Sequence, residues 1–294
     1  MNGIIVVNKE KGMTSHDVVN KIRKIFNTKK VGHLGTLDPD AEGVLAVCIN
    51  DATKLVQFLE NETKEYIAGI RLGIGTDTYD LSGKITNDMY VNDINANTID
   101  ECLNSFLGKS MQMPPIYSAI KINGRKLYEY ARNNIDVEIK PRSINISYIE
   151  RTSAIHRNEK YLEFNFKVIV SKGTYIRSLC KDIGEKLNYP AVMSSLLRTR
   201  SGVFKINDAS TIDEISSGKY KLYSMEESVI NIALLTDSDS VKKAYHGMKI
   251  SKNVVFEKYN DYPNLVRIMD NDKLIAIYEY DNVINCYRAA RVWN

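Results

Sequence analysis

The residues best suited to do chemistry lie in one short stretch, His33 to Leu45, which reads HLGTLDPDAEGVL. Its glycines permit a tightly folded backbone, and Pro39 disfavours helical geometry at the residue before it. Asp38 is therefore expected on a constrained loop, which is how a reactive carboxylate is presented. The alternative interpretation is a turn in which the Asp38 side chain only accepts backbone N–H groups.

Positive charge is concentrated in three segments of the chain. The net charge of +4 and the pI of about 8.6 fit many proteins that never meet a polyanion. Residues 1–33, however, carry seven Lys or Arg against two acids, and basic groups mixed with tyrosines recur at 121–142 and 172–205. Binding RNA requires cations for the phosphates and rings for the bases. A solvated charged face is the competing interpretation.

The cysteines and histidines form no ligand pattern. The four cysteines are far apart and include no C-x-x-C pair, and the four histidines show no H-x-x-x-H spacing. A G-x-x-x-x-G-K motif, which would cradle a nucleotide phosphate, is also missing from the sequence. We therefore expect neither a metal nor any other cofactor.

The N-terminal segment MNGIIVVNKEKG has an apolar run of only four residues before its charges begin. Such a run is too short for the apolar region of a signal peptide or for a membrane span. The sequence therefore predicts a cytoplasmic protein that makes no contact with a membrane.

The elements that must position Asp38 form a mixed pattern of strands and helices. Helical patterns follow Thr14 and cover 98–108 and 176–188. Apolar or alternating runs predict strands at 3–9, 44–49, 65–74, 144–150 and 161–170. Together they predict an α+β domain over residues 1–230, built on a mixed, largely antiparallel sheet.

Two further segments are expected to stand apart from this sheet. Residues 121–142 are basic and contain a short helical pattern, so they predict an arm that could close on a ligand. A polar linker at 216–227 leads to strand-like runs in residues 235–294. These runs predict a small C-terminal β-barrel, which resembles the RNA-binding module known as PUA.

The string from His33 to Leu45 resembles the catalytic motif H-x-G-x-L-D-P-x-A-x-G-x-L of TruB-type pseudouridine synthases. Two residues depart from the family pattern, since Glu10 and Ala46 stand where proline is usual. What Glu10 does to the first loop is left open by the sequence. Five more blocks follow the family order, namely KEKGMTS (9–15), KEY (64–66), TDTYDLSG (76–83), PPIYSAIK (114–121) and SKGTYIRSL (171–179).

The resemblance implies an isomerase that converts uridine 55 in the T-loop of tRNA to pseudouridine. It makes Asp38 the catalytic carboxylate, Arg177 its ion-pair partner and Tyr66 the ring stacked on the target base. Detaching uracil, rotating it and rejoining it through C5 needs an anionic group but no redox step. A neighbouring guanidinium keeps such a carboxylate ionised in a dry pocket. Attack on C1′, attack on C6 and promotion of a glycal all stay open.

Chemistry on a stacked base also requires that the base be flipped out and the gap filled. The resemblance assigns the gap-filling role to His33. Tyr175 and Leu197 match positions that line the family's pocket, although both could equally be core residues. The remaining expected contacts are Lys9, which supports the catalytic loop, and the arm residues Arg125, Lys126 and Arg132, which meet the RNA backbone.

Three other functions are alternatives to the interpretation as a tRNA pseudouridine synthase. A non-catalytic RNA-binding or tRNA-folding protein would use the same basic faces, but it should have lost Asp38 or Arg177, and both are present. A base-excising glycosylase would need a second group to activate water. A synthase acting on another RNA, such as one guided by an RNA particle, shares the fold. We expect tRNA, through its T-loop and stem, as the partner of a monomer that needs no obligate protein partner.

Overall fold

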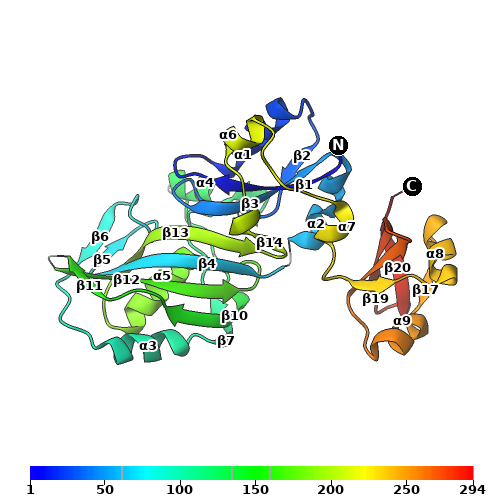
Figure 1. Ribbon diagram of the computed structural model, residues 1–294. Helices are drawn as coiled ribbons and strands as arrows, with labels where there is room; N and C mark the ends of the chain where they lie inside the picture. The colour runs from blue at the N-terminus through cyan, green and yellow to red at the C-terminus, as the bar shows by residue number, and fades with distance from the viewer. Residues whose placement is uncertain (61, 119, 134, 159, 294) are drawn as a thin grey trace.

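The structure is a computed structural model that describes residues 1–60, 62–118, 120–133, 135–158 and 160–293. Figure 1 shows a large part built on one long sheet and a small part at the C-terminal end of the chain. The chain passes from the first to the second after the short helix α7 (Met225–Ser228).

The large part is organised around strand β13 (Ala191–Ser201), which lies in the middle of the sheet. It pairs antiparallel with β4 along its length but parallel with β3 at only two positions. The described strands follow the order β15 (Leu222–Tyr223), β1 (Gly3–Lys9), β3 (Glu42–Ile49), β13, β4 (Lys64–Leu72), β12 (Tyr161–Val170), β10 (Arg142–Arg151) and β7 (Gly108–Gln112). Short strands at the margins are β2 (Val31–His33), β11 (His156–Asn158) and β14 (Phe204–Lys205).

The burial of each strand explains its sequence pattern. Strands β1 and β3 are buried on both faces, so their sequences are continuous apolar runs. Strand β12 alternates, with Phe164, Phe166 and Val168 in the core while Asn165 and Lys167 face outward. One face of the sheet is therefore open to solvent on the β4–β12 side.

Helices contribute to two apolar clusters with the sheet, one on each face of β1. Helix α1 (Ser15–Ile25) begins with a capping box between Thr14 and Asp17, as the sequence predicted, and buries Val18, Val19 and Ile22. The remaining helices of the large part are η1 (Asn50–Leu55), α2 (Val56–Leu59), α3 (Ala96–Asn104), α5 (Ile176–Lys186), η2 (Ile206–Asp208) and α6 (Ile212–Ser216).

Two hairpins project from the sheet. The first joins β5 (Ile74–Thr76) to β6 (Ile85–Asp88). The second joins β8 (Lys121–Ile122) to β9 (Arg125–Lys126), and its turn residues Asn123 and Gly124 both have positive φ angles of 49° and 83°. This is the backbone that an Asn-Gly hairpin turn requires. Helix α4 (Leu127–Arg132) follows at once, so the predicted basic arm contains a hairpin and a helix.

The small part has its own core around Tyr278 and Tyr287. Its strands follow the order β16 (Ala233–Leu235), β18 (Leu265–Asp270), β19 (Lys273–Asp281), β20 (Cys286–Val292) and β17 (Ile250–Ser251), and they curl into a half-barrel. The α+β class with a small C-terminal β-rich part is thus confirmed. The helices α8 (Ser238–Tyr245) and α9 (Lys252–Tyr259) of this part were not predicted.

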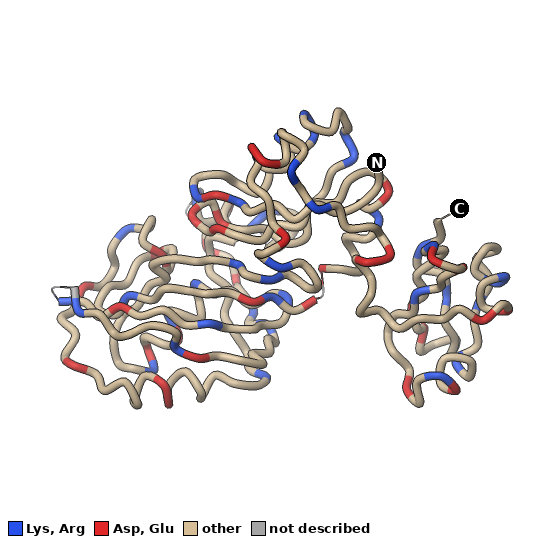
Figure 2. The backbone as a smooth tube through the Cα atoms, viewed as in Figure 1, with Lys and Arg blue, Asp and Glu red and all other residues tan. Residues whose placement is uncertain are grey.

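Charged side chains are spread over both parts of the molecule. Figure 2 shows Lys and Arg interspersed with Asp and Glu, so charge alone does not mark a binding surface. Among the described residues, every helix is too short or too polar to cross a bilayer. In the same part of the chain, His, Cys, Asp and Glu side chains form no group of three that could hold a metal ion.

Candidate active site

The loop that carries Asp38 connects β2 to β3 and is fixed from the N-terminal segment. Gly35 lies in the left-handed region at φ 77°, which favours glycine. The carbonyl of Pro39 accepts hydrogen bonds from the Gly12 N–H at 2.9 Å and from Lys9 Nζ at 3.1 Å. The end of β1 and the turn after it therefore hold the residue that follows Asp38.

A second set of bonds fixes the other side of this loop. Ser15 Oγ accepts a hydrogen bond from the Leu37 N–H at 2.9 Å and donates one to the Leu37 carbonyl at 3.1 Å. Behind the loop, β3 passes so close to β13 that a Cβ on Gly43 would lie 2.3 Å from the Arg198 carbonyl oxygen. The KEKGMTS segment and Gly43 thus fix the backbone on which Asp38 stands.

Arg177, from the start of α5, holds the Asp38 carboxylate with two nitrogens. Its Nε lies 2.9 Å from Asp38 Oδ2, and its Nη2 lies 3.3 Å from Asp38 Oδ1. The same guanidinium donates to the carbonyls of Thr78 and Tyr117 at 3.1 and 3.0 Å, and its Nε is 3.8 Å from Asp80 Oδ2. The Arg177 side chain is only 8% exposed, whereas Asp38 is 39% exposed.

This geometry suits a carboxylate that must react. A two-nitrogen contact from a guanidinium stabilises the ionised form and sets its orientation. Because Arg177 is buried and Asp38 is not, the carboxylate lies between the guanidinium and the open space in front of it. An ionised, oriented and accessible carboxylate can act as a nucleophile or as a general base.

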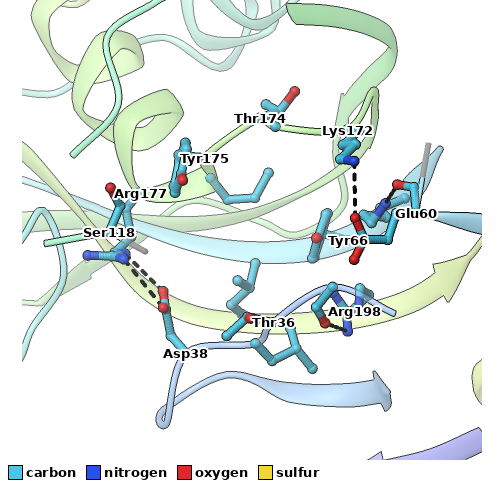
Figure 3. Close-up of a pocket in the computed structure, with 16 residues that line it drawn as sticks. Thr36, Asp38, Glu60, Tyr66, Ser118, Lys172, Thr174, Tyr175, Arg177 and Arg198 are labelled. Carbon is cyan, nitrogen blue, oxygen red and sulfur yellow. Dashed lines mark hydrogen bonds and ion pairs between the residues drawn. The ribbon is translucent and has the colours of Figure 1, made fainter. Parts of the chain in front are cut away.

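Two hollows meet at Asp38 and Arg177. The first is a cavity of about 290 Å³, shown in Figure 3, whose walls include Asp38, Tyr66, Tyr175, Arg177 and Leu196. The second is a cleft of about 680 Å³ that brings Tyr128 and Arg132 of the arm onto the same loop. Two side chains of the arm therefore line the same cleft as the Asp38 loop.

Two tyrosines contribute to the walls of the cavity. Tyr66 lies on β4 and is buried. Tyr175 precedes α5, and its backbone N–H and carbonyl form two hydrogen bonds, of 2.9 and 3.1 Å, with the Gln112 amide. Burial raises the pKa of the Tyr175 phenol, so this ring stays neutral at physiological pH. Both rings can therefore pack against a neutral base.

Not every predicted residue reaches the cavity. Leu197 lies outside its walls, and its neighbour Leu196 lines it instead, because successive side chains of a strand point to opposite faces. His33 ends β2 outside the walls of both hollows. Its Nδ1 is buried without a hydrogen-bond partner in the described part of the chain, and burial followed by the Arg198 charge lowers its pKa.

The three predicted arm residues lie in different surroundings. Lys126 Nζ and Arg132 Cζ lie 5.4 and 5.3 Å from the centre of the Tyr128 ring. Arg132 also lines the cleft next to Asp38, whereas Arg125 lines a separate depression beside α4. The arm thus presents cations around an aromatic ring.

The sequence did not single out three groups that the structure brings to the site. Asp80 lies in a block whose resemblance was noted, but no role was attached to it. Arg198 is buried and donates from Nε to the Val44 carbonyl at 2.7 Å and from Nη2 to the Gly35 carbonyl at 3.0 Å. Lys64 lines the cavity beside Tyr66. Asp80 and Lys64 lie within recognised blocks, which was the available signal, whereas Arg198 lies outside all six.

The comparisons with known proteins give one result. Residues 23–176 match the TruB family pseudouridylate synthase N-terminal domain, and residues 177–237 match the tRNA pseudouridylate synthase B C-terminal domain. The tRNA pseudouridine synthase B of Listeria monocytogenes serotype 4b (strain F2365) is 45% identical over 286 residues, which cover 95% of this chain and 93% of the relative. That of Staphylococcus saprophyticus is 44% identical over 290 residues, 95% of this chain and 94% of the relative.

A solved structure described as a Cbf5-Nop10-Gar1 complex contains a chain of the same fold. The TM-score is 0.71 at 28% identity, over 99% of this chain and 84% of that one. A related structure, described as an H/ACA RNP bound to a substrate RNA containing 2′-deoxyuridine, gives a TM-score of 0.70 at 26% identity over 99% of this chain and 85% of that one. With both domain matches in chain order and relatives aligned from end to end, the chain belongs to the TruB family of pseudouridylate synthases.

Proposed function

We propose that this protein converts uridine 55 in the T-loop of tRNA to pseudouridine, with Asp38 as the reacting carboxylate. The observation that carries the proposal is the Asp38–Arg177 pair on the wall of a cavity that also holds Tyr66 and Tyr175. The relatives that are 45% and 44% identical over nearly the whole chain are named tRNA pseudouridine synthase B.

The reaction divides into a flip, a cleavage and a rejoining. Flipping places the uracil against Tyr66, at an unstacking cost of a few kcal/mol, and brings its sugar to Asp38. The N1–C1′ bond then breaks, the base rotates, and a C5–C1′ bond forms. The proton on C5 leaves and N1 gains one, so no electrons are supplied from outside. Arg177 keeps Asp38 ionised for attack on C1′ or C6, or for removal of a proton in a glycal route.

The surrounding residues take supporting roles in this proposal. Lys9 donates to the Pro39 carbonyl and so positions the catalytic loop. His33 has a buried ring with a lowered pKa, so it is a neutral imidazole. In this form it fills the space that the flipped base leaves in the RNA. Residues 121–142 act as the arm that closes on the RNA, and residues 235–294 form a second RNA-binding domain next to the catalytic domain of residues 1–230.

We further propose that the enzyme works as a monomer in the cytoplasm, where its substrate is found. The Asp38–Arg177 pair and the cavity walls described above come from a single chain, so the site is built without a partner. Light scattering of the purified protein, alone and with tRNA, tests this point. A mass of two chains in both samples would overturn it.

The test of the activity uses purified protein and an unmodified tRNA transcript, with EDTA present in half of the reactions. Pseudouridine is mapped by chemical labelling and primer extension. We expect it at uridine 55 alone and in equal yield with EDTA, because the proposed chemistry needs only side chains. A tRNA without a modified T-loop uridine, or modification at another position, would contradict the proposal. The assay is repeated with a prefolded stem-loop RNA. This distinguishes a requirement for Mg²⁺ in folding the RNA from a requirement for Mg²⁺ in the enzyme.

A further inference from the structure

The cavity carries a group of cations at the end away from Asp38. Figure 3 shows the Asp38–Arg177 pair at one end and an ion pair between Lys172 and Glu60 at the other. Lys172 Nζ lies 3.1 Å from Glu60 Oε2, and the two side chains are 50% and 36% exposed. Both residues line the cavity although they lie 112 positions apart in the chain.

Lys64 is the buried member of this group. Its side chain lines the cavity, and its ammonium donates to the carbonyls of Glu60 and Glu62 at 3.0 and 2.9 Å. An ammonium has three N–H groups, so within the part of the chain that the structure describes these two bonds leave one N–H unused. Capping the carbonyls after α2 explains the two bonds, but it does not require a cation in the wall of a catalytic cavity.

Arg198 brings a second buried cation to the same place. Its Nε and Nη2 donate hydrogen bonds to the carbonyls of Val44 and Gly35. A Cβ built on Gly35 would lie 3.4 Å from Lys64 Cε and 3.6 Å from Arg198 Nη1. Gly35 therefore stands between the two cations, and its missing side chain leaves room next to both.

The charges at this end do not balance. Lys64, Lys172 and Arg198 are three cations, and Glu60 is the acid that lines the cavity with them. Buried charges are costly unless they are paired, so an unbalanced group in a cavity wall favours an anionic ligand. The proposed substrate carries such anions, because a nucleotide flipped into the cavity brings its phosphates with it.

We propose that Lys64, Lys172 and Arg198 form a subsite for a phosphate group next to the flipped uridine, and that Lys172 leaves Glu60 to bind this phosphate. The inference rests on the proposed function, since it takes RNA as the ligand. Glu60 is then a placeholder that keeps Lys172 at the edge of the cavity while no RNA is bound. Lys64 supplies its remaining N–H, and Arg198 adds charge from behind Gly35.

The protonation of Lys64 gives this subsite a pH signature. Burial, reinforced by the charges of Arg198 and Lys172 and opposed by those of Glu60 and Glu62, lowers the pKa of Lys64 to about 8. A bound phosphate stabilises the ammonium and raises that pKa again. Above about pH 8, RNA binding should therefore be accompanied by uptake of a proton. The affinity of wild type for RNA should fall above that pH, and the affinity of Lys64→Met should fall less.

The decisive experiment pairs protein variants with modified RNA. T-stem-loop RNAs carry one uncharged methylphosphonate, placed in turn at each phosphate from two nucleotides before the target uridine to two after it. Dissociation constants are measured for wild type, Lys64→Met and Lys172→Met, together with Lys167→Met as a control. Lys167 is also paired with a carboxylate, Glu65, at 3.2 Å, but it lies on the open face of the sheet.

We expect Lys64→Met and Lys172→Met each to bind unmodified RNA about tenfold more weakly, and Lys167→Met to bind like wild type. At one methylphosphonate position the affinity of wild type should fall by a similar factor, and the affinity of the two variants should fall no further. The subsite would be overturned if, at every methylphosphonate position, the loss of affinity from the modified RNA multiplied with the loss from the protein variant. Wild-type affinity of Lys172→Met, whose half-exposed side chain makes misfolding an inadequate explanation, would also overturn it.

Two additional measurements separate this inference from the proposed function. Glu60→Gln removes the placeholder, so it should bind unmodified RNA at least as tightly as wild type, and weaker binding would count against the exchange. Turnover of unmodified RNA by wild type is recorded in parallel. If wild type forms no pseudouridine the proposed function fails, whereas turnover without coupling between Lys64 and any single phosphate overturns the subsite alone.

Discussion

The guanidinium of Arg177 and the carboxylate of Asp38 meet through two nitrogen–oxygen contacts of 2.9 and 3.3 Å. The two residues are 139 positions apart in the chain, with Asp38 on the loop between β2 and β3 and Arg177 at the start of α5. The Arg177 side chain has further bonds to the Thr78 and Tyr117 carbonyls, so its orientation is set from three directions. The position of the Asp38 carboxylate therefore depends, through Arg177, on the Thr78 and Tyr117 segments.

Replacing Arg177 with Lys tests whether this two-nitrogen contact matters beyond its charge. Lysine keeps the positive charge but cannot reproduce the planar fork. We expect single-turnover rates to fall by about 10- to 100-fold, the equivalent of a charge-assisted hydrogen bond of ~1.5–3 kcal/mol. The Kd for tRNA should change little. Arg200→Lys is the control. Arg200 lies on β13 and is bonded to Thr63 and the Gly202 carbonyl, so this variant should keep wild-type rates.

Lys9→Met tests the support of the catalytic loop. Lys9 is fully buried and donates to the carbonyls of Glu10 and Pro39 at 2.9 and 3.1 Å. Removing the ammonium leaves these buried carbonyls with fewer donors, so the free energy of unfolding in urea should drop by about 1–3 kcal/mol. The single-turnover rate should fall while the Kd for tRNA stays within about threefold of wild type, half a kcal/mol or so. An unchanged rate would remove Lys9 from its positioning role.

The sequence predicted the strands whose patterns are simple. Strand β12 alternates because one of its faces is open, and β1 is uniformly apolar because both of its faces are covered. The central strand β13 escaped prediction. Its sequence AVMSSLLRTRS contains register shifts between Met193 and Ser195 and between Arg198 and Arg200, which break the alternation. Leu197 was expected in the pocket from the family resemblance, whereas the structure places Leu196 in the cavity wall.

Long-range contacts account for the rest of what the sequence could not predict. Arg198 looks like a surface cation in the sequence, and only the folded chain brings the Val44 and Gly35 carbonyls to it. In the C-terminal part, α9 was missed because its apolar residues do not gather on one face and only Val255 is buried. The Asp38 loop, in contrast, could be predicted because its geometry depends on local glycine and proline residues.

Replacing Arg125, Lys126 and Arg132 together with Ala tests the contact between the arm and RNA. Each phosphate contact contributes about 0.7 to 0.9 to the slope of log affinity against log salt, so loss of three contacts should decrease the slope by up to about 2 to 3 units. The affinity at low salt should fall, because the side chains around the Tyr128 ring and the cleft would lose their charge.

The control for this experiment is a triple variant on the open face of the sheet, Arg71, Lys160 and Lys167 to Ala. These side chains are all paired with acids, at 2.7, 2.5 and 3.2 Å, and lie away from the arm. It removes the same number of charges and should leave the salt slope near that of wild type. Equal salt slopes in the two triple variants would mean that the arm does not contact the RNA backbone.

The pH dependence of stability reports on His33. Burial, followed by the charge of Arg198, lowers the His33 pKa below its usual value, so the folded state favours the neutral ring. In the window between the folded pKa and about 6.5, the unfolded chain binds more protons. The stabilisation is therefore complete above about pH 6.5 and is lost as the pH falls through the folded pKa. Urea unfolding between pH 7.5 and about 5 should show a shallower loss of stability for His33→Gln than for wild type, and parallel curves would contradict the assignment.

Asp38→Asn is the sharpest test of whether the Asp38 carboxylate performs the chemistry, because it keeps the size of the side chain and removes its charge. An amide can neither attack the sugar or base nor take up a proton as a general base. Affinity for tRNA depends on contacts with phosphates and loop shape over a wide surface, so it should change less than about tenfold, or ~1.4 kcal/mol. Asp40→Asn, two residues further along the same loop, serves as the matched control and should keep wild-type turnover.

The measurement is a single-turnover assay and a filter-binding titration on the same samples of wild type, Asp38→Asn and Asp40→Asn, with an unmodified tRNA transcript. We predict that Asp38→Asn binds this tRNA but forms no detectable pseudouridine, while Asp40→Asn converts uridine 55 like wild type. Substantial pseudouridine formation by Asp38→Asn would contradict the account.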